Sequence, residues 1–286
     1  MHRQTWLITG CSSGFGSLFV TEILRRGDHA IATARSLESL ESLMEAGASC
    51  LQLDVTASQA ELDAKIEMAE AMFGPIDIVV NNAGYAEVGI LEDSSVLMNR
   101  SQDVFQRQYD TNLFGTVKMT RSILPLFRRR RAGIIVMMSS VGGNVGMPGA
   151  SPYFSSKFAI EGLSECLRLE TSHLNIRTLV IQPGMFRTSS LTTRSHRNNN
   201  SGREDYAALN ETMGAAHSMQ GTQRGDPTKM VMRVVDLVKG TGLAEGKPMP
   251  ETLPMGIDAV QAIRLKCEKT LRNLQDWEEM SCGTDY

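Results

Sequence analysis

The sequence predicts an α/β protein built on a doubly wound parallel sheet that is flanked by helices. Short apolar runs alternate with amphipathic helical segments along the first two thirds of the chain. This alternation is typical of βαβ units, in which a helix crosses over the sheet between two parallel strands. The strand-like runs are apolar throughout, as expected for strands covered on both faces. We therefore expect ligands to bind at the carboxyl ends of the strands.

The individual elements follow from apolar spacing and from the turn residues between the runs. Strands are expected at residues 5–10, 29–35, 50–55, 76–84, 133–140 and 176–184, with a short one near 250–254. Helices are expected at residues 15–26, 36–46, 58–73, 101–127, 153–172, 227–240 and 256–278. The polar stretch 187–226 interrupts this pattern and includes three consecutive Asn residues at 198–200. It can be read as a disordered linker or as a mobile lid with short helices, and we favour the lid because long insertions in compact domains are commonly functional.

Composition limits the classes of partner and compartment. The chain has 286 residues, a net charge of −3 and a pI near 6.0. Such a balance disfavours a nucleic-acid partner, and we interpret the Arg run at 128–131 as a solvated helix end. The five cysteines are odd in number and form no CxxC motif, which indicates a reducing compartment, and we expect the cytoplasm. We expect neither a signal peptide nor a transmembrane segment.

A glycine-rich loop, TGCSSGFG at 9–16, joins the first expected strand to the first expected helix. Glycines let the backbone approach a pyrophosphate, and the helix N-terminus offers free N–H groups and the positive end of its dipole. Glycines also occur in ordinary tight turns, but the strand before and the helix after favour dinucleotide binding. The spacing is GxxxGxG rather than GxGxxG. The expected cofactor-binding residues of this loop are Gly10, Ser12, Ser13, Gly14, Phe15 and Gly16.

The end of the second strand indicates which dinucleotide is bound. A carboxylate at this place would bind the ribose 2′-OH of NAD, whereas Arg accepts the 2′-phosphate of NADP. The sequence has Arg35 there, followed by Ser36, and Ser12 and Ser13 add hydroxyl donors from the loop. A guanidinium binds phosphate through paired hydrogen bonds. Arg35 can also be an ordinary surface residue, but we predict NADP(H) as the cofactor.

Seven motifs in order along residues 5 to about 190 resemble the short-chain dehydrogenase/reductase family. They are TGCSSGFG (9–16), LDVT (53–56), NNAG (81–84), TNLFG (111–115), SS (139–140), YFSSK (153–157) and PGMFRT (183–188). Within the family the sequence is similar to hydroxysteroid and retinol dehydrogenases and to fungal-type ketone reductases. The resemblance implies a single domain over residues 1–286. Its parts are a dinucleotide-binding and catalytic core at 1–186, a substrate lid at 187–226, and C-terminal helices with a short strand at 227–286.

The resemblance also implies a role for each matching position. Contact with adenine is implied for Asp54 and Val55, and lining of the adenosine ribose for Asn82, Ala83 and Gly84. Contact with the nicotinamide carboxamide is implied for Pro183, Gly184, the backbone near Phe186, and Thr188. Ser140 matches the catalytic serine because it lies 13 residues before Tyr153, and Ser139 would be its structural neighbour.

Tyr153 and Lys157 lie four residues apart and so share one helix face. A phenol has a pKa near 10, and a neighbouring cation favours the phenolate. We therefore expect Lys157 to lower the pKa of Tyr153, which would donate a proton to a carbonyl oxygen. The pair can also be two exposed helix residues. Lys157 would in addition bind the nicotinamide ribose, and Ser140 would hold the substrate oxygen.

Asn112 has poor helix propensity in its expected helix. It is either a surface residue or the holder of a water that connects Lys157 to solvent. The residues expected around the substrate are mostly apolar and indicate a hydrophobic ketone or secondary alcohol, although such residues often serve only packing. These pocket residues are Val141, Val145, Met147, Phe186 and Leu191. The five scattered histidines suggest no metal site.

Small residues recur along the expected 153–172 helix at Ala159, Gly162 and Cys166. They would allow another helix to approach, and the resemblance implies a homodimer or homotetramer through this helix and the 101–127 helix. Burial within one subunit explains the same residues.

Together these expectations describe an NADPH-dependent enzyme that reduces a ketone and reversibly oxidises a secondary alcohol. Two other readings stay open. One is a tailoring enzyme whose reaction includes cyclisation or another non-redox step, and the other is a non-catalytic regulator that senses NADP.

Overall fold

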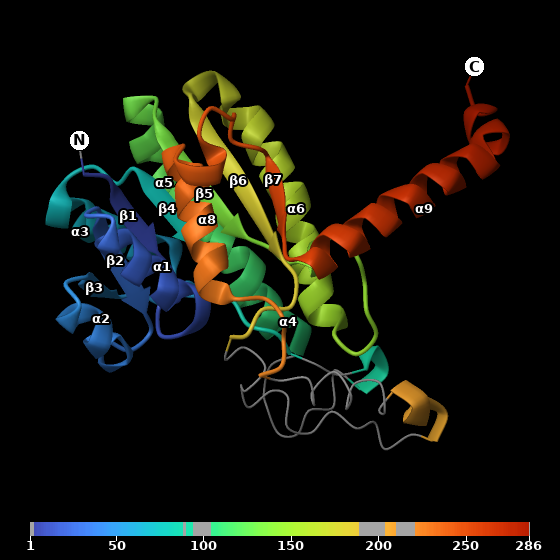
Figure 1. Ribbon diagram of the computed structural model, residues 1–286, viewed down its shortest axis with the longest axis horizontal. Coiled ribbons are helices and arrows are strands. Elements are labelled where there is room, and N and C mark those ends of the chain that lie inside the picture. The colour runs from blue at the N-terminus through green and yellow to red at the C-terminus, as the bar shows by residue number, and fades with distance from the viewer. Residues whose placement is uncertain (1–2, 88–89, 94–103, 189–203, 210–220, 286) are drawn as a thin grey trace.

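The computed structural model has one seven-stranded parallel sheet in the order β3-β2-β1-β4-β5-β6-β7 (Figure 1). It describes residues 3–87, 90–93, 104–188, 204–209 and 221–285. All seven expected strands are present, and most end a few residues before the expected boundary because the last residues turn into the loops. The strands are β1 (Thr5–Ile8), β2 (His29–Ala34), β3 (Ser49–Gln52), β4 (Ile78–Asn81), β5 (Gly133–Met138), β6 (Ile176–Pro183) and β7 (Thr252–Met255).

Helices connect the strands in the βαβ manner that the sequence predicts. The α-helices with their bounds are α1 (Gly14–Arg25), α2 (Glu41–Glu45), α3 (Gln59–Phe73), α4 (Val104–Tyr109), α5 (Gly115–Arg130), α6 (Ser151–Thr171), α8 (Pro227–Lys239) and α9 (Ile257–Cys282). Short turns complete the set at η1 (Glu38–Leu40), η2 (Leu91–Asp93), η4 (Val141–Gly143), η5 (Ser172–Leu174), η8 (Glu204–Tyr206) and η9 (Gly242–Ala244). The expected 36–46 helix is thus a 3₁₀ turn followed by one short helix.

The expected 101–127 helix differs most from the structure. From Val104 onward it consists of three consecutive elements: α4, a π-helical turn η3 (Asp110–Phe114), and α5. The last of these continues through Pro125 to Arg130. Such π turns are frequent at functional sites because they widen the helix and redirect one side chain. The Arg run forms the last turn of α5, and Arg131 closes it in the left-handed conformation with φ 51°. Arg128, Arg129 and Arg131 are exposed, which agrees with a solvated helix end.

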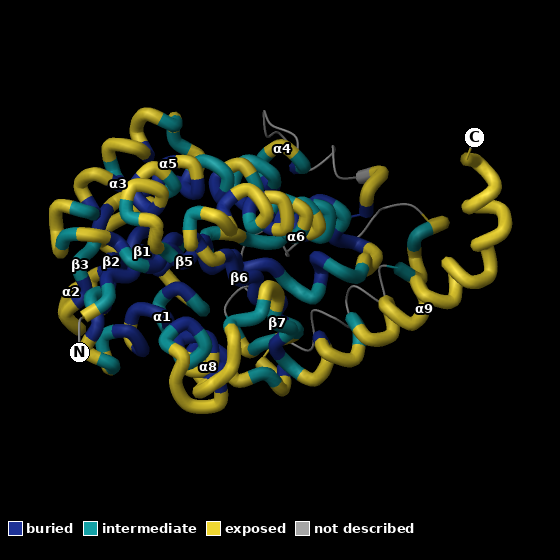
Figure 2. Tube along the Cα trace, turned by 90° about the horizontal axis from the view of Figure 1, so that it is seen from above, coloured by how far each residue is buried: buried dark blue, intermediate teal, exposed yellow. Residues whose placement is uncertain are grey.

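Two apolar layers sandwich the sheet. Alternate residues of one strand point to opposite faces, so Ile78 and Val80 of β4 join one core cluster while Val79 joins the other. The first cluster packs the sheet against α1 and α8, and the second packs it against α3, α5 and α6, as the view in Figure 2 also shows. The continuous apolar strands in the sequence are explained by this double coverage.

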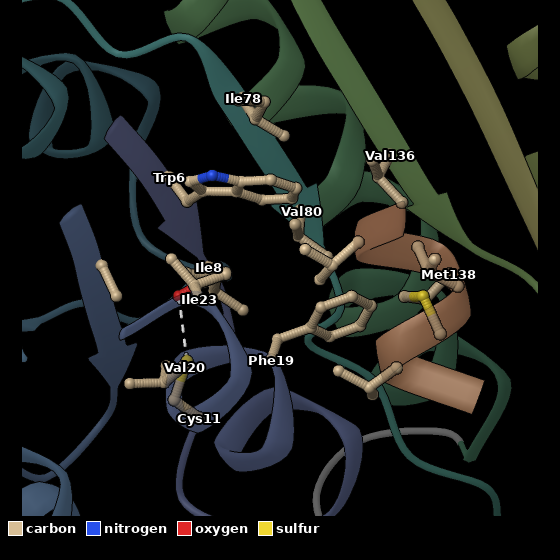
Figure 3. Close-up of a cluster of buried hydrophobic side chains, with 14 of the residues drawn as sticks. Trp6, Ile8, Cys11, Phe19, Val20, Ile23, Ile78, Val80, Val136 and Met138 are labelled. Atoms are coloured by element: carbon tan, nitrogen blue, oxygen red, sulfur yellow. Dashed lines mark hydrogen bonds between the residues drawn. The ribbon is translucent and has the colours of Figure 1, made fainter. Parts of the chain in front are cut away.

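Figure 3 shows the first core layer around the start of the chain. Trp6 of β1 and Phe19 of α1 are fully buried there, with Val136 and Met138 of β5 nearby. The Cys11 thiol donates to the carbonyl oxygen of Ile8 at 3.2 Å, and burial raises its pKa to about 12. Cys11 is therefore an inert core residue rather than a reactive thiol.

The sheet order reverses between β1 and β4, because β2 and β3 lie on one side of β1 and all later strands lie on the other. Loops that leave neighbouring strands in opposite directions open a crevice at their carboxyl ends, and doubly wound proteins bind ligands there. The glycine-rich loop after β1 and the NNAG segment after β4 meet at this point.

The C-terminal helix α9 extends away from the body of the protein (Figure 1). Ala259 is its only buried residue, and the whole stretch from Arg264 to Cys282 is exposed. No helix in the described part of the chain has the length and apolar character needed to cross a bilayer.

Replacing Phe19 by Ala should lower the free energy of unfolding by about 3–5 kcal/mol, because the fully buried ring would leave a cavity between α1 and the sheet. Urea unfolding followed by circular dichroism measures the change. The matched control is Phe158→Ala, whose ring is 44% exposed and whose loss should cost less than about 1 kcal/mol. Equal losses for both variants would show that this layer does not carry the fold.

Candidate active site

The glycine-rich loop is shaped by close backbone approaches that no side chain would permit. Gly10 has φ +70°, and a Cβ there would lie 2.8 Å from the Cα of Ala83. A Cβ on Gly16 would lie 2.3 Å from the carbonyl oxygen of Gly10. Both glycines are therefore required by the geometry of the loop itself, independently of any ligand.

The NNAG segment holds this loop in place from the neighbouring strand. The side-chain amide of Asn82 donates to the carbonyl oxygens of Thr9 and Gly10 at 2.8 and 3.0 Å. In return, the Thr9 hydroxyl accepts from the backbone N–H groups of Asn82 and Ala83 at 3.0 and 2.9 Å. The Asn82 amide is thus used to brace the loop. Thr9 takes part in three of these four hydrogen bonds. Its role could not be predicted, because a threonine at the end of a strand carries no distinctive signal in the sequence.

The N-terminus of α1 follows the carboxyl end of β1 and carries exposed hydroxyl groups. Ser12 and Ser13 are exposed, and Ser13 precedes the helix in an extended conformation without a side-chain capping bond. Unpaired N–H groups and hydroxyls at a helix start form a suitable place for a phosphate. Arg35 and Ser36 follow β2 directly and are exposed at the same edge of the sheet.

The side chains of Asp54 and Val55 in the LDVT segment after β3 make contacts within the protein. The Asp54 carboxylate accepts from the backbone N–H and the hydroxyl of Thr56 at 2.9 and 2.8 Å. Val55 is buried, and a Cβ on Gly115 would lie 2.7 Å from its side chain. The glycine in the TNLFG motif is explained by this contact.

Ser140, Tyr153 and Lys157 come together where β5 ends and α6 begins. The side chains of Ser140 and Tyr153 are in hydrogen-bonding contact, and the Lys157 ammonium lies 5.7 Å from the centre of the Tyr153 ring. Lys157 is buried, and its Nζ donates to the carbonyl oxygen of Met138 at 2.7 Å. Ser140 precedes η4 and its hydroxyl accepts from the backbone N–H of Gly142 at 3.0 Å. Tyr153 and Lys157 are thus not a pair of exposed helix residues.

The direction of the Tyr153 pKa corrects one expectation. Burial raises this pKa above its ordinary value of 10.0, and only the contact with Ser140 opposes the rise. Burial likewise lowers the pKa of Lys157 from 10.5 to about 8, although the charge of Glu161 opposes the change. The expected lowering of the Tyr153 pKa by Lys157 is therefore wrong for the protein without a ligand. The physical reason is that removal of water disfavours both charged forms.

Glu161 lies one further turn along α6, and the sequence analysis missed it. Its Oε2 accepts from the Gln182 side chain of β6 at 3.0 Å, and its Oε1 lies in the neighbourhood of the Ser139 hydroxyl, since both flank Gly143. Burial raises the pKa of Glu161, whereas the contacts with Ser139 and Gln182 and the charge of Lys157 lower it. The signal available in the sequence is the continued four-residue spacing from Tyr153 through Lys157 to Glu161.

Asn112 is buried inside the π turn, so the reading of a surface helix residue is wrong. Its Oδ1 accepts from the backbone N–H of Tyr85 at 3.1 Å, and its Nδ2 donates to the Tyr85 carbonyl at 2.9 Å and to the Ser156 hydroxyl at 3.2 Å. Ser156 sits between Tyr153 and Lys157 on α6. Asn112 therefore ties the loop after β4 to the helix that carries both residues.

The PGMFRT segment closes the crevice from the side of β6. Gly184 faces the carboxylate of Asp258 in the first turn of α9, where a Cβ would lie 2.3 Å from its oxygens. Asp258 also accepts from the backbone N–H of Met185 at 2.6 Å. The ring of Phe186 meets that of Phe15 edge to face at 5.7 Å, which connects this segment to the glycine-rich loop.

Thr188 lies near the start of α1, since a Cβ on Gly14 would be 3.9 Å from the Thr188 side chain. Among the expected pocket residues, Val141 and Val145 are half-buried near Ser140, and Met147 is 56% exposed. Leu191 lies outside the described residues. Within the described ranges, no three or more His, Cys, Asp or Glu side chains are grouped to hold a metal ion.

Comparison with known proteins identifies the family of this chain. The family described as short chain dehydrogenase matches residues 4–199. The chain belongs to the short chain dehydrogenase family. It is an oxidoreductase, and the fold and the family expected from its sequence are confirmed.

This short chain dehydrogenase is similar to curated relatives and to a solved structure. It is 34% identical to "Oxidoreductase BOA17" of Botryotinia fuckeliana, over 98% of this chain and 99% of that one. It is 35% identical to human "Retinol dehydrogenase 8", over 63% of this chain and 58% of that one. A short-chain dehydrogenase from Streptomyces avermitilis matches the whole of both chains with a TM-score of 0.84 and 31% identity.

The buried charge of Lys157 predicts a specific dependence of stability on pH. The unfolded chain keeps this proton up to about pH 10.5, whereas the folded protein releases it near pH 8. Between these values the unfolded state binds more protons, so stability rises with pH. Relative to Lys157→Met, the wild type should gain up to about 3 kcal/mol over this window.

Urea unfolding of both cofactor-free proteins at a series of pH values from about 7 to about 10.5 measures this difference. The control is Lys247→Met, which changes an exposed lysine and should follow the wild type at every pH. A constant difference between wild type and Lys157→Met across the series would show that burial does not disfavour the ammonium.

Proposed function

We propose that the protein is an NADPH-dependent reductase of a fairly hydrophobic ketone and that it reversibly oxidises the corresponding secondary alcohol. The observation that carries the proposal is the meeting of Ser140, Tyr153 and Lys157 at the carboxyl edge of the sheet, beside the glycine-rich loop. Such a group can polarise a carbonyl and supply a proton next to a bound dinucleotide. Neither alternative reading is favoured by an observation of its own.

The cradle between β1 and β4 fits a dinucleotide. A pyrophosphate needs close backbone approach and free N–H donors, and the glycine-rich loop with the start of α1 supplies both. We assign the 2′-phosphate of NADP to Arg35 with help from Ser36. Asn82, Ala83 and Gly84 would line the adenosine ribose, and Asp54 and Val55 the adenine, with Val55 acting through its backbone because its side chain is buried.

NADPH, when bound, supplies a hydride to the carbonyl carbon. The residues of the chain would control the oxygen. Ser140 would donate a hydrogen bond to it, and the Tyr153 hydroxyl would transfer its proton to it as the alkoxide forms. Lys157 would stabilise the resulting phenolate by its charge, since an adjacent cation favours the ionised form.

The pKa of Tyr153, which burial raises, fits the role of proton donor, because the hydroxyl stays protonated until the reaction begins. The positive charge of the oxidised nicotinamide would then lower the pKa of Tyr153. More of the residue would be phenolate, which is the form that accepts the proton of the alcohol in the reverse direction. We propose that Asn112 acts on this chemistry by positioning, since its side chain holds Ser156 and the loop at Tyr85. Asn112 would also hold a water that connects Lys157 to solvent, as the family resemblance implies.

The nicotinamide and the substrate would meet beside the PGMFRT segment. Pro183, Gly184, the backbone of Phe186 and Thr188 would face the carboxamide, and Phe186 with Val141, Val145, Met147 and Leu191 would line an apolar pocket. We propose that residues 187–226, of which 189–203 and 210–220 lie outside the described residues, form its lid. In support, Arg187 donates a backbone bond to the carbonyl of Gly225 at 3.0 Å, so the segment returns to where it begins.

We propose that the protein acts as a homodimer or homotetramer in the cytoplasm. Gly162 and Cys166 are exposed on α6, so burial within the subunit does not explain these small residues. All five cysteines are unpaired, which suits a reducing compartment.

Replacing Tyr153 by Phe should lower ketone reduction roughly 10²- to 10⁴-fold, because general acid catalysis of this kind contributes about that much. The fall of the NADPH absorbance band with a panel of apolar ketones measures turnover, and fluorescence titration measures NADPH binding, which should persist. The control is Tyr109→Phe, a half-buried tyrosine on α4. A loss below tenfold would contradict the assigned role. Binding of NADPH by the wild type without any loss of absorbance would favour a non-redox enzyme or a sensor.

Arg35→Ala should lower kcat/KM for NADPH roughly 10- to 100-fold and leave that for NADH nearly unchanged, because a charged hydrogen bond to the 2′-phosphate is lost. Steady-state kinetics with both cofactors tests this, and Arg128→Ala removes an exposed arginine far from the crevice as a control. Equal efficiency of the wild type with NADPH and NADH would overturn the assignment of Arg35.

A further inference from the structure

The C-terminal helix α9 has little to pack against in the described part of its own chain. Beyond its first turns every residue is exposed, and the helix points away from the body (Figures 1 and 2). Helices in proteins owe most of their stability to packing of an amphipathic face rather than to helix propensity. A surface that supports it must therefore come from outside the described subunit.

An apolar stripe runs along one side of α9. Its members recur at spacings of three and four residues, which keeps them on one face of a helix. They are Val260, Ile263, Cys267, Leu271, Leu274 and Trp277. Leu271, Leu274 and Trp277 are 60%, 61% and 56% exposed. A stripe of this kind normally faces a core, but here it faces solvent.

The charges of α9 run against its own dipole. The basic residues lie in its middle, at Arg264, Lys266, Lys269 and Arg272. The acidic residues Asp276, Glu278 and Glu279 lie near its C-terminus, and the last turn contains no basic residue. Carboxylates at a helix C-terminus destabilise it, and cations there would stabilise it. Asp258 in the first turn suits the dipole and Glu268 lies among the basic residues, so the unfavourable charges are those of the C-terminal half.

We propose that α9 pairs with α9 of a second copy of this chain in antiparallel orientation. If the two-fold axis passes at Leu271, Arg264 lies level with Glu278 of the partner subunit, and both residues border the stripe on the same side. The apolar stripes then face each other, and the acidic end of each helix meets the basic middle of the other. A parallel pair would instead set like charges level with each other.

A membrane surface fits this helix less well than a second copy. Helices that lie on anionic bilayers carry a lysine- or arginine-rich polar face. In α9 the carboxylates near the C-terminus balance the basic residues, so the attraction to anionic lipid would be lost along half of the exposed length. The pairing also lies apart from the small-residue face of α6, so it stands whether or not that face forms a contact.

The double variant Leu271→Asp/Leu274→Asp tests the stripe by light scattering of the full-length protein. It should have half the molar mass of the wild type, because one two-fold contact is lost. The matched control Leu243→Asp changes a leucine that is 71% exposed outside α9 and should keep the wild-type mass. Thermal unfolding of the body confirms that both variants are folded. An unchanged mass for the double variant, or a monomeric wild type, would overturn the proposal.

The charge pairing has its own test. One variant makes the C-terminal half of α9 basic (Asp276→Lys/Glu278→Lys/Glu279→Lys), and another makes its middle acidic (Arg264→Glu/Lys266→Glu/Lys269→Glu/Arg272→Glu). Each alone should show the halved mass, and an equimolar mixture should restore the wild-type mass. A mixture that stays at the halved mass would overturn pairing by opposite charges.

Cysteine cross-linking reports the orientation. In a background with Cys166→Ser, Cys267→Ser and Cys282→Ser, Leu271→Cys should form a disulfide dimer on oxidation, because the axis passes there. With only Cys166 and Cys267 replaced, Cys282 should not link, because two copies of it would lie about 33 Å apart at 1.5 Å per residue. Disulfide formation through Cys282 would indicate a parallel pair. Sedimentation of the wild type with phosphatidylserine vesicles would indicate a membrane surface instead, and either result would overturn the proposal.

Discussion

The hydrogen bond from the Lys157 ammonium to the carbonyl oxygen of Met138 fixes the geometry on which the rest of the site depends. It joins the first turns of α6 to the end of β5, two residues before Ser140. Tyr153, one turn earlier on the same helix, is thereby held beside the Ser140 hydroxyl. This arrangement places the Lys157 ammonium where there is little water. Burial therefore lowers the pKa of Lys157 to about 8, and the negative charge of Glu161 opposes this change. The polar groups that would handle a proton are thus held within the rigid edge of the sheet rather than on a loop.

The half of the crevice assigned to the cofactor is built in the same way. Thr9 at the end of β1 and Asn82 at the end of β4 exchange hydrogen bonds, and the glycine-rich loop is suspended between them. Adjacent parallel strands bring these two segments together although they are 73 residues apart. Because these hydrogen bonds and the close backbone contacts of Gly10 and Gly16 fix the loop, its shape is determined by the chain itself. Both halves therefore depend on strand ends whose positions the buried sheet determines.

Most of the fold could be predicted from the sequence because doubly covered strands and amphipathic helices leave clear periodicities. The site motifs were also readable, since the glycines of the loop and the pair Tyr153 and Lys157 interact over short stretches of chain. The spacing showed which groups share a face but not whether water reaches them, so the direction of the Tyr153 pKa was wrong. Residues whose partners lie far along the chain were missed, as with Asp258 and the backbone of Met185. The burial of Asn112 depends on the π turn, for which the sequence offers no periodic signal.

The contact between Asp258 and the PGMFRT segment gives the two parts of the last helix different importance. The carboxylate anchors the backbone at Met185 and occupies the space beside Gly184, although it belongs to a helix that otherwise leaves the body. Loss of the chain beyond Arg264 would remove only turns that are exposed in the subunit, whereas loss of seven more residues would remove Asp258 and release the segment that it holds. The part of α9 that the body of the subunit needs therefore ends near its first turns, and the remaining turns are left for the contact with a second copy, so fusion tags or truncations at this end of the chain should be designed around both parts.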